Sequence, residues 1–402
     1  MKTLTIKIFF LLLFSSSLFA QDVWKDLEKK IVTLHDSDKI DLYLEFTWKN
    51  RGDHPQLSIK AGKLALRTIE QNEFFTKKPL ALNYLGVIYR NLGDYKEALS
   101  FFSRGLEAAK KYDDKTQLAH AYNNLGSLHR LMGNGSLAIE QTFKGLKIFE
   151  ELKDSAGMAF CALNLGVLYS NQKNYKRAIE YLQRVIDIRK RIGDKPGELT
   201  AQVRIAEVYF ELADYEKAYS IYLYTLDEHK KRNEEIGMAF AYGGLSTIFF
   251  ARGDFNEALN YRLKSLEINS KINQNVAIIS DYCQIALIQA RLNNFPSGKN
   301  YLDKAVALAK TIKSFYFSFT VYNAASEFYG LQSDFKNAFN YSQLASQMKD
   351  SIRALEGLEK SAQIEAVYKN EQTEREAELA QIQLANKEQE TTYLYLIILV
   401  VA

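Results

Sequence analysis

Residues 81–98 read ALNYLGVIYRNLGDYKEA, and residues 161–178 read CALNLGVLYSNQKNYKRA, which repeats the same pattern two periods later. Both stretches place a small residue eight positions before an Asp or Asn and twelve positions before an Ala. The pattern returns every 40 residues along the middle of the chain. Self-similarity at a fixed period of this size is the sequence sign of a repeat architecture.

Three columns of residues define the repeat. The first column holds small residues: Gly86, Gly126, Gly166, Ala206, Ser246, Ala286 and Ser326. The second column holds Asp or Asn: Asp94, Asn134, Asn174, Asp214, Asp254, Asn294 and Asp334. The third column is again small: Ala98, Ala138, Ala178, Ala218, Ala258, Gly298 and Ala338. Small residues on two antiparallel helices let their backbones approach closely, and we expect each Asp or Asn to cap the second helix.

The predicted unit is therefore helix, short turn, helix, and the residue before the cap supports it. Gly93, Gly133 and Gly253 suit the left-handed conformation that ends a first helix. The unit resembles the tetratricopeptide (TPR) repeat, whose Leu-Gly-x-x-Tyr pattern followed by Ala is seen at 85–98 and again at 165–178. TPR units are about 34 residues long, so the extra residues here must lengthen the helices.

The terminal Pro of the TPR pattern is absent, and HEAT repeats have a similar period. The paired small columns and the capped turn nevertheless favour the TPR interpretation. This resemblance implies an all-α, right-handed helical solenoid of about seven repeats.

The regions outside the repeats divide the chain further. Residues 1–20 have the charged, apolar, small-residue order of a cleaved signal peptide, so we expect export. Residues 21–78 are predicted to form a degenerate helical repeat that caps the solenoid of residues 79–346. Residues 347–390 are predicted to form a charged stalk helix, and residues 391–402 to begin a transmembrane helix.

Both C-terminal predictions have alternatives. The apolar stretch of residues 391–402 is about half of the ~20 residues that span a bilayer, so it could instead be a tail packed on the solenoid. Leu355, Leu358 and Ile364 begin a broken apolar seam along the stalk. A long polar helix usually has a partner, which predicts a homodimer, with a single solvated helix as the alternative.

Catalytic, metal and cofactor chemistry find no support in the sequence. The five histidines have no metal-ligand spacing, and His129 stands in a column with Tyr89 and Tyr169, which favours a packed core histidine. Cys161 and Cys283 are better interpreted as buried apolar residues than as a disulfide. The net charge of +4 is too small to argue for nucleic acid. We therefore expect no catalytic centre, cofactor or metal site in these residues.

The first helices are expected to line the concave surface of the solenoid, where a peptide or protein ligand would bind. Asn side chains can bond to an extended peptide backbone, and Arg can hold a carboxylate through two donors. The hypothesised ligand-binding residues are Asn83, Arg90, Asn123, Asn124, Arg130, Asn164 and Arg204. The alternative for each is hydrogen bonding between repeats or a solvated polar face.

Signal peptide, lengthened TPR array, charged stalk and transmembrane start, in that order, resemble the sensor half of bacterial membrane histidine kinases with TPR input regions. A related group carries a helix-turn-helix transcription regulator in the same place. The resemblance implies sensing in the periplasm by a region anchored in the inner membrane. A membrane-anchored periplasmic scaffold is a further alternative.

Overall fold

The computed structural model describes residues 23–352, except residues 53, 273 and 313–314. The chain divides into two units, residues 1–349 and residues 350–402. The predicted signal peptide, nearly all of the predicted stalk and the predicted transmembrane start lie outside the described residues. Within the described part, no helix is long and apolar enough to cross a membrane.

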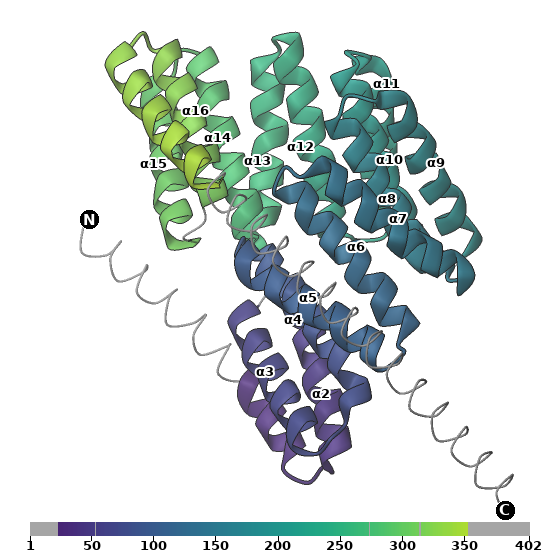
Figure 1. The fold of residues 1–402 in the computed structure, drawn as a ribbon. Coiled ribbons are helices and arrows are strands. Elements are labelled where there is room, and N and C mark those ends of the chain that lie inside the picture. Colours follow the sequence, from purple (N-terminus) through teal and green to yellow (C-terminus); the bar gives the residue numbers. More distant parts are fainter. Residues whose placement is uncertain (1–22, 53, 273, 313–314, 353–402) are drawn as a thin grey trace, which may run out of the picture. The chain divides into compact units, whose positions relative to one another are not determined.

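The described residues form helices joined by short turns, with no β-strand among them (Figure 1). Before the array, residues 23–31 are helical, and α2 (Asp36–Lys49), α3 (Pro55–Gln71) and the short 3₁₀ helix η1 (Phe75–Lys77) follow. The first helices of the repeats are α4 (Lys78–Asn91), α6 (Lys115–Leu131), α8 (Ser155–Asn171), α10 (Lys195–Glu211), α12 (Glu235–Arg252), α14 (Asn275–Arg291) and α16 (Phe315–Leu331). The second helices are α5 (Tyr95–Lys111), α7 (Gly135–Glu151), α9 (Tyr175–Arg191), α11 (Tyr215–Lys231), α13 (Phe255–Lys271), α15 (Phe295–Ile312) and residues 335–352.

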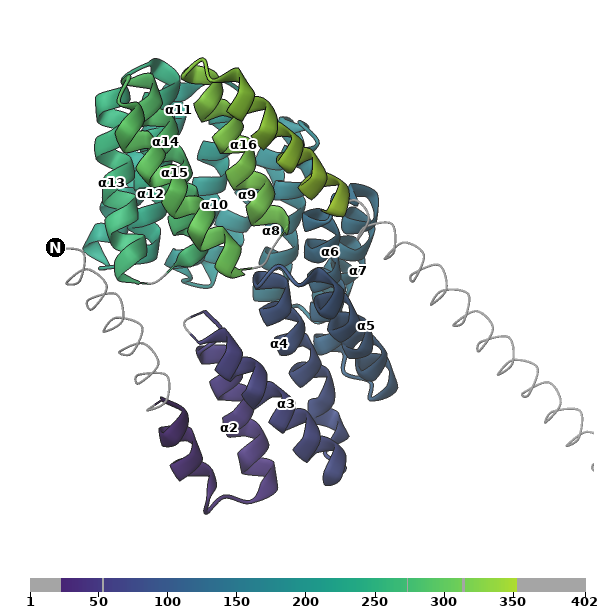
Figure 2. The same cartoon turned by 90° about the vertical axis from the view of Figure 1, so that its left-hand side faces the viewer.

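These helices confirm an all-helical, TPR-like solenoid, and Figure 2 shows the same pairs from the side. Nearly every described helix packs most extensively on a helix next to it in sequence, and successive first helices such as α4 and α6 also touch. The predicted N-terminal helix pair is present as α2 and α3.

The turns explain the period of 40. A residue with left-handed backbone follows the helices every 20 positions from Glu73 to Gly253 and again at Asn293 and Ser333. The residues between the first and last of the unbroken series are Gly93, Asp113, Gly133, Lys153, Lys173, Gly193, Ala213 and Asn233. The helices between these turns contain 17 or 18 residues from α5 onward. The predicted role of the three turn glycines is confirmed, and other residue types adopt the same conformation elsewhere.

The predicted caps are present at five of the seven second helices. The side chain of Asp94 accepts a hydrogen bond from the Glu97 N–H at 3.2 Å, and the same bond recurs at Asn174, Asp214, Asn294 and Asp334. The side chains of Asn134 and Asp254 make no such bond, so the prediction was wrong there. A second set of caps was not predicted: Asp114, Asp154 and Asp194 cap the first helices α6, α8 and α10.

The small columns mark close helix contacts, as predicted. A Cβ atom added at Gly126 would lie 2.2 Å from Thr142 Oγ1 and 3.0 Å from the Ala138 carbonyl oxygen. Where the column holds Ser246, the hydroxyl donates to the Ala258 carbonyl across the helix pair at 2.7 Å. The first and third columns therefore face each other inside each repeat.

The core is a row of local clusters along the array. One apolar column supplies much of it, at Leu85, Leu125, Leu165, Ile205, Leu245, Ile285 and Ala325, all buried. Cys161 and Cys283 are buried and free, which confirms the sequence interpretation. Burial raises the pKa of each thiol to about 12, so both remain protonated at neutral pH.

Candidate functional site: a groove along the first helices

A groove of about 870 Å³ runs along the first helices α8, α10, α12 and α14. Its wall includes Val203, Glu207 and Phe210 of α10, together with Gly243 and Thr247 of α12. On each helix these residues share one face, because residues spaced three or four apart lie on the same side. The groove therefore lies along the first helices, which the sequence predicts to line the ligand-binding surface.

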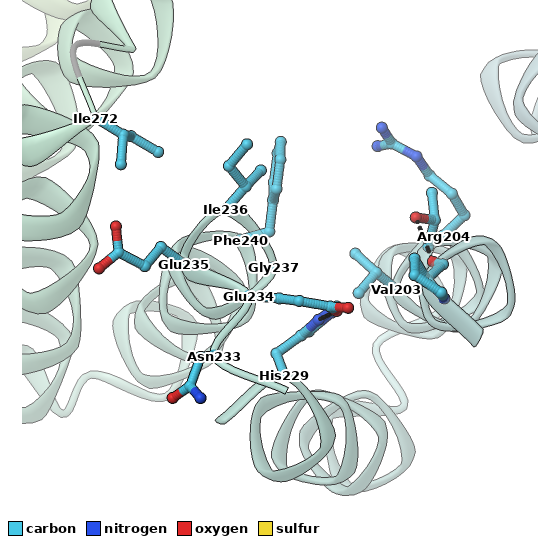
Figure 3. A pocket seen from close by; sticks show the side chains of 12 residues that line it. Val203, Arg204, His229, Asn233, Glu234, Glu235, Ile236, Gly237, Phe240 and Ile272 are labelled. Carbon is cyan, nitrogen blue, oxygen red and sulfur yellow. Dashed lines mark hydrogen bonds and ion pairs between the residues drawn. The ribbon is translucent and has the colours of Figure 1, made fainter. Parts of the chain in front are cut away.

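A second cavity of about 580 Å³ adjoins the groove at the start of α12 and shares part of its wall. Figure 3 shows Ile236 and Phe240 projecting side by side from α12, between Ile272 on one side and Val203 and Arg204 on the other. Ile236 is 54% exposed and Phe240 is 57% exposed. Large apolar side chains that gather in an open cavity are typical of a binding surface.

The sequence reasoning missed Ile236 and Phe240. Phe240 lies one turn and Ile236 two turns before Gly243 on α12. Residues spaced three or four apart share a helix face, so both lie on the same side as Gly243 and Thr247. Extending that row backward would have found them.

Polar side-chain pairs lie beside this cavity. His229 Nδ1 lies 2.8 Å from Glu234 Oε2, and Arg204 Nη1 donates to both carboxylate oxygens of Glu207 at 2.8 Å. The cavity wall therefore combines apolar side chains with a few polar groups, which is the usual composition of a ligand site.

A buried polar network forms one wall of the larger groove. Arg262 Nη1 of α13 lies 3.2 Å from Asp281 of α14, and its Nη2 donates to the Gly243 carbonyl and the Thr247 hydroxyl of α12, each at 3.0 Å. Asn269 donates to Asp281 at 2.7 Å. The network links three consecutive helices.

Both members of this ion pair are nearly removed from water, since their side chains are 8% and 3% exposed. Burial lowers the pKa of Arg262, although Asp281 opposes this effect. Burial raises the pKa of Asp281 above its usual range, and the Arg262 charge offsets only part of that rise. The pair therefore carries a desolvation cost.

A comparison between the repeats would have found this pair. Arg262 occupies the otherwise uncharged column of Phe102, Thr142, Leu182, Tyr222, Leu302 and Ser342. Asp281 occupies the column of Ala81, Ala121, Cys161, Ala201, Ala241 and Val321. Each column thus contains one charged residue, and these two residues of opposite charge contact each other between adjacent helices.

The predicted asparagines bond mostly between repeats. Asn83 is buried, and its Nδ2 donates to the Gln117 carbonyl at 3.1 Å. Asn164 Nδ2 donates to Asn123 Oδ1 at 2.8 Å. These contacts match the alternative given for them, and neither they nor the partly buried Asn124 line the two cavities. A ligand-binding role for these four residues stays a prediction.

The structure brings the three predicted arginines together. Burial and, to a smaller extent, the nearby Arg130 charge lower the pKa of Arg90 to about 10. Burial also lowers the pKa of Arg130, helped by the charge of Arg204. Arg204 lines the smaller cavity, so a positively charged region adjoins the apolar part of the groove.

Known proteins share this architecture. The family model of the tetratricopeptide repeat matches residues 79–151 and 158–223. No curated protein sequence matches the chain.

Several solved structures have a similar fold. The Rap conjugation gene regulator of the plasmid pLS20, in complex with the Phr* peptide, is 12% identical, with a TM-score of 0.57 over 80% of this chain and 96% of that chain. NprR in complex with its cognate peptide NprX is 16% identical, with a TM-score of 0.53 over 80% of this chain and 97% of that chain. A Rap protein complexed with competence and sporulation factor is 13% identical, with a TM-score of 0.51 over 79% and 99%.

Identities this low show a shared fold alone. The family match and the helix-pair geometry nevertheless agree over the first four repeats. The chain therefore contains tetratricopeptide repeats at residues 79–151 and 158–223, within a longer TPR-like helical solenoid.

Proposed function

We propose that this chain is the peptide-sensing input region of a signal-transduction protein. The observation that carries the proposal is the groove of about 870 Å³ along the first helices, together with the exposed Ile236 and Phe240 at its edge. Two proteins of similar fold were solved with a bound peptide and a third with competence and sporulation factor, which supports a peptide ligand here.

The chemistry of the groove suits a short peptide. Its apolar edge can bury aliphatic or aromatic side chains, and each fully buried side chain of that size contributes about 2 kcal/mol. Arg204 and Glu207 at its polar edge can exchange their mutual ion pair for contacts with peptide charges. A solvent-exposed pair of this kind is worth little, so its loss would be readily offset.

Binding of short peptides to the full-length chain tests the proposal. A fluorescent peptide library, with apolar residues varied at each position, would be screened by anisotropy. Phe240→Ser should abolish binding of any selected peptide and leave the melting temperature unchanged, because the side chain is 57% exposed. The matched control is Phe339→Ser, on the last second helix, which removes a side chain that is 63% exposed and should leave binding intact. Failure of every peptide, or equal binding by both variants, would reject the proposal.

We also propose a cellular location and an output domain for the protein. The order of segments supports an exported solenoid in the periplasm, anchored in the inner membrane by a helix that begins in residues 391–402. In this reading the output is a cytoplasmic histidine kinase. Membrane fractionation of the full-length chain, with protease added from the periplasmic side, would test the location.

Two alternatives share the groove and differ in output. A membrane-tethered helix-turn-helix regulator would continue after Ala402 into a DNA-binding domain, whereas the kinase would continue into an ATP-binding domain. A periplasmic scaffold would continue into neither, so the reading frame beyond Ala402 separates the three. Pairing of two chains through residues 347–390 predicts a dimer by sedimentation, and a monomeric full-length chain would exclude it.

A further inference from the structure

Three partly buried arginines of the array have a carboxylate partner. Arg189 lies 2.6 Å from Asp194, Arg204 lies 2.8 Å from Glu207, and Arg262 lies 3.2 Å from Asp281. The pattern has a physical cause, because a charge removed from water without a partner is strongly unfavourable.

Arg90 and Arg130 depart from this pattern. Within the described residues, neither guanidinium lies within 4.0 Å of a carboxylate. Arg90 donates to the amide oxygen of Asn91, which carries no charge, at 3.1 and 3.3 Å. The Nε atom of Arg130 is buried and finds no hydrogen-bond acceptor in the described part of the chain.

The two arginines also face the same region. They hold equivalent positions near the ends of α4 and α6, two first helices in direct contact. The Arg130 charge is near enough to help lower the pKa of Arg90. Two partly buried like charges without a negative partner form a site that an anion would stabilise.

Two tyrosines from opposite ends of the array lie near enough to Arg130 to influence its pKa. Tyr95 begins α5, directly after the turn that follows Arg90, and Tyr316 stands near the start of α16. Tyr95 and Tyr316 each interact electrostatically with Arg130, and they also interact with each other. Figures 1 and 2 both bring the start of α16 close to the end of α4.

We propose that Arg90 and Arg130 bind a carboxylate of the peptide ligand and that Tyr95 and Tyr316 close this site, so that the bound ligand ties the seventh repeat to the first two. The inference rests on the proposed peptide-sensing function. Guanidinium groups bind a carboxylate through paired donors, and a phenol O–H supplies a further donor. The last described helix, residues 335–352, directly follows α16, so a ligand that fixes α16 also restrains the helix that leads out of the array.

Acetate is the probe for the anion site, because it is the smallest carboxylate and needs no peptide. The full-length chain would be melted in sodium acetate and in sodium chloride at equal ionic strength. We expect the melting temperature to be higher in acetate by about 2 °C or more, since a ligand that binds only the folded state stabilises it. Arg90→Gln combined with Arg130→Gln should remove this difference.

The same variant separates a binding role from a structural one. If the arginines mainly held the fold together, the double variant would melt lower in chloride. In chloride we expect the double variant to melt at or above the wild-type temperature, because it removes two positive charges that repel each other and have no carboxylate partner. Arg67→Gln, at an exposed position on α3, is the control and should keep the acetate effect.

Hydrogen exchange tests the closure. Acetate should slow amide exchange at the start of α16 as well as at the ends of α4 and α6. In Tyr316→Phe, the acetate-induced protection at α16 should disappear. Protection confined to α4 and α6 would overturn the closure.

An absent acetate effect, or one that survives in the double variant, would overturn the anion site even if peptides bind at Phe240. An acetate effect without any peptide binding would instead contradict the proposed function. Once a peptide is known, amidation of its C-terminus and replacement of its acidic side chains by amides identify which carboxylate binds.

Discussion

His129 is 3% exposed and stands in a column with aromatic residues such as Tyr169 and Phe249. Burial lowers its pKa from 6.5 to about 4. The unfolded chain therefore binds a proton here at a higher pH than the folded chain. The stabilisation linked to neutral His129 is complete above pH 6.5 and is lost as the pH falls toward 4.

A shift of this size predicts an acid-sensitive fold. Between pH 7 and pH 4, the free energy of unfolding should fall by about 3 kcal/mol through His129. His129→Phe, which restores the aromatic character of the column, should remove that part of the pH dependence. Urea unfolding at the two pH values measures both chains, and an equal loss in wild type and variant would contradict the assignment.

Ala213 adopts a left-handed backbone with φ of 58°, in the turn where Gly93 and Gly253 stand in other repeats. This conformation costs a residue with a Cβ atom about 1–2 kcal/mol, whereas glycine adopts it freely. Ala213→Gly should therefore raise the free energy of unfolding by several tenths of a kcal/mol, after the added freedom of the unfolded chain is subtracted. The control is Ala251→Gly in α12, which should lower it; a loss of stability in both variants would show that the turn is not strained.

Arg262 and Asp281 connect three helices. Removing one member of this ion pair should change stability far more than replacing both. Asp281→Ala leaves the Arg262 charge buried without its partner and should cost about 3–5 kcal/mol. The double variant Arg262→Leu/Asp281→Ala restores the residue types of the neighbouring repeats, such as Leu302 and Ala241. It should lie within about 1 kcal/mol of wild type, because a packed apolar pair avoids the desolvation cost.

Denaturant unfolding of the two single variants and the double variant forms a complete cycle. A double variant as unstable as Asp281→Ala would show that the ion pair itself holds α12, α13 and α14 together. Near-native stability with weaker peptide binding would place the role of the pair in the groove that it lines.

The whole array is built from contacts between neighbouring helices, so its stability should be local. In arrays of this kind, each repeat is stabilised by itself and by its interfaces with adjacent repeats. Asp281→Ala should therefore speed amide exchange in α12, α13 and α14 while α4 to α6 keep their native protection. Hydrogen exchange with mass spectrometry resolves these segments. A uniform increase along the chain would mean that the array unfolds as one cooperative unit.

The repeat columns determined the fold at this scale because each column has a local cause. The turn glycines, most of the predicted caps and the facing small residues were all predicted from spacing alone, and the structure confirms them. The position of the groove on the first helices was also expected, and its wall residues Val203, Glu207 and Phe210 share one face of α10 because residues on one helix face recur at fixed intervals.

Contacts between repeats were decided only by the tertiary structure. Spacing gives the face of a helix on which Asn123 lies, yet not that its carboxamide meets Asn164 of the next repeat. Spacing also cannot show that Tyr316 of the seventh repeat lies near enough to Arg130 of the second repeat to influence its pKa. Periodicity along the chain fixes local geometry, whereas the approach of distant repeats depends on small rotations that accumulate from one helix pair to the next.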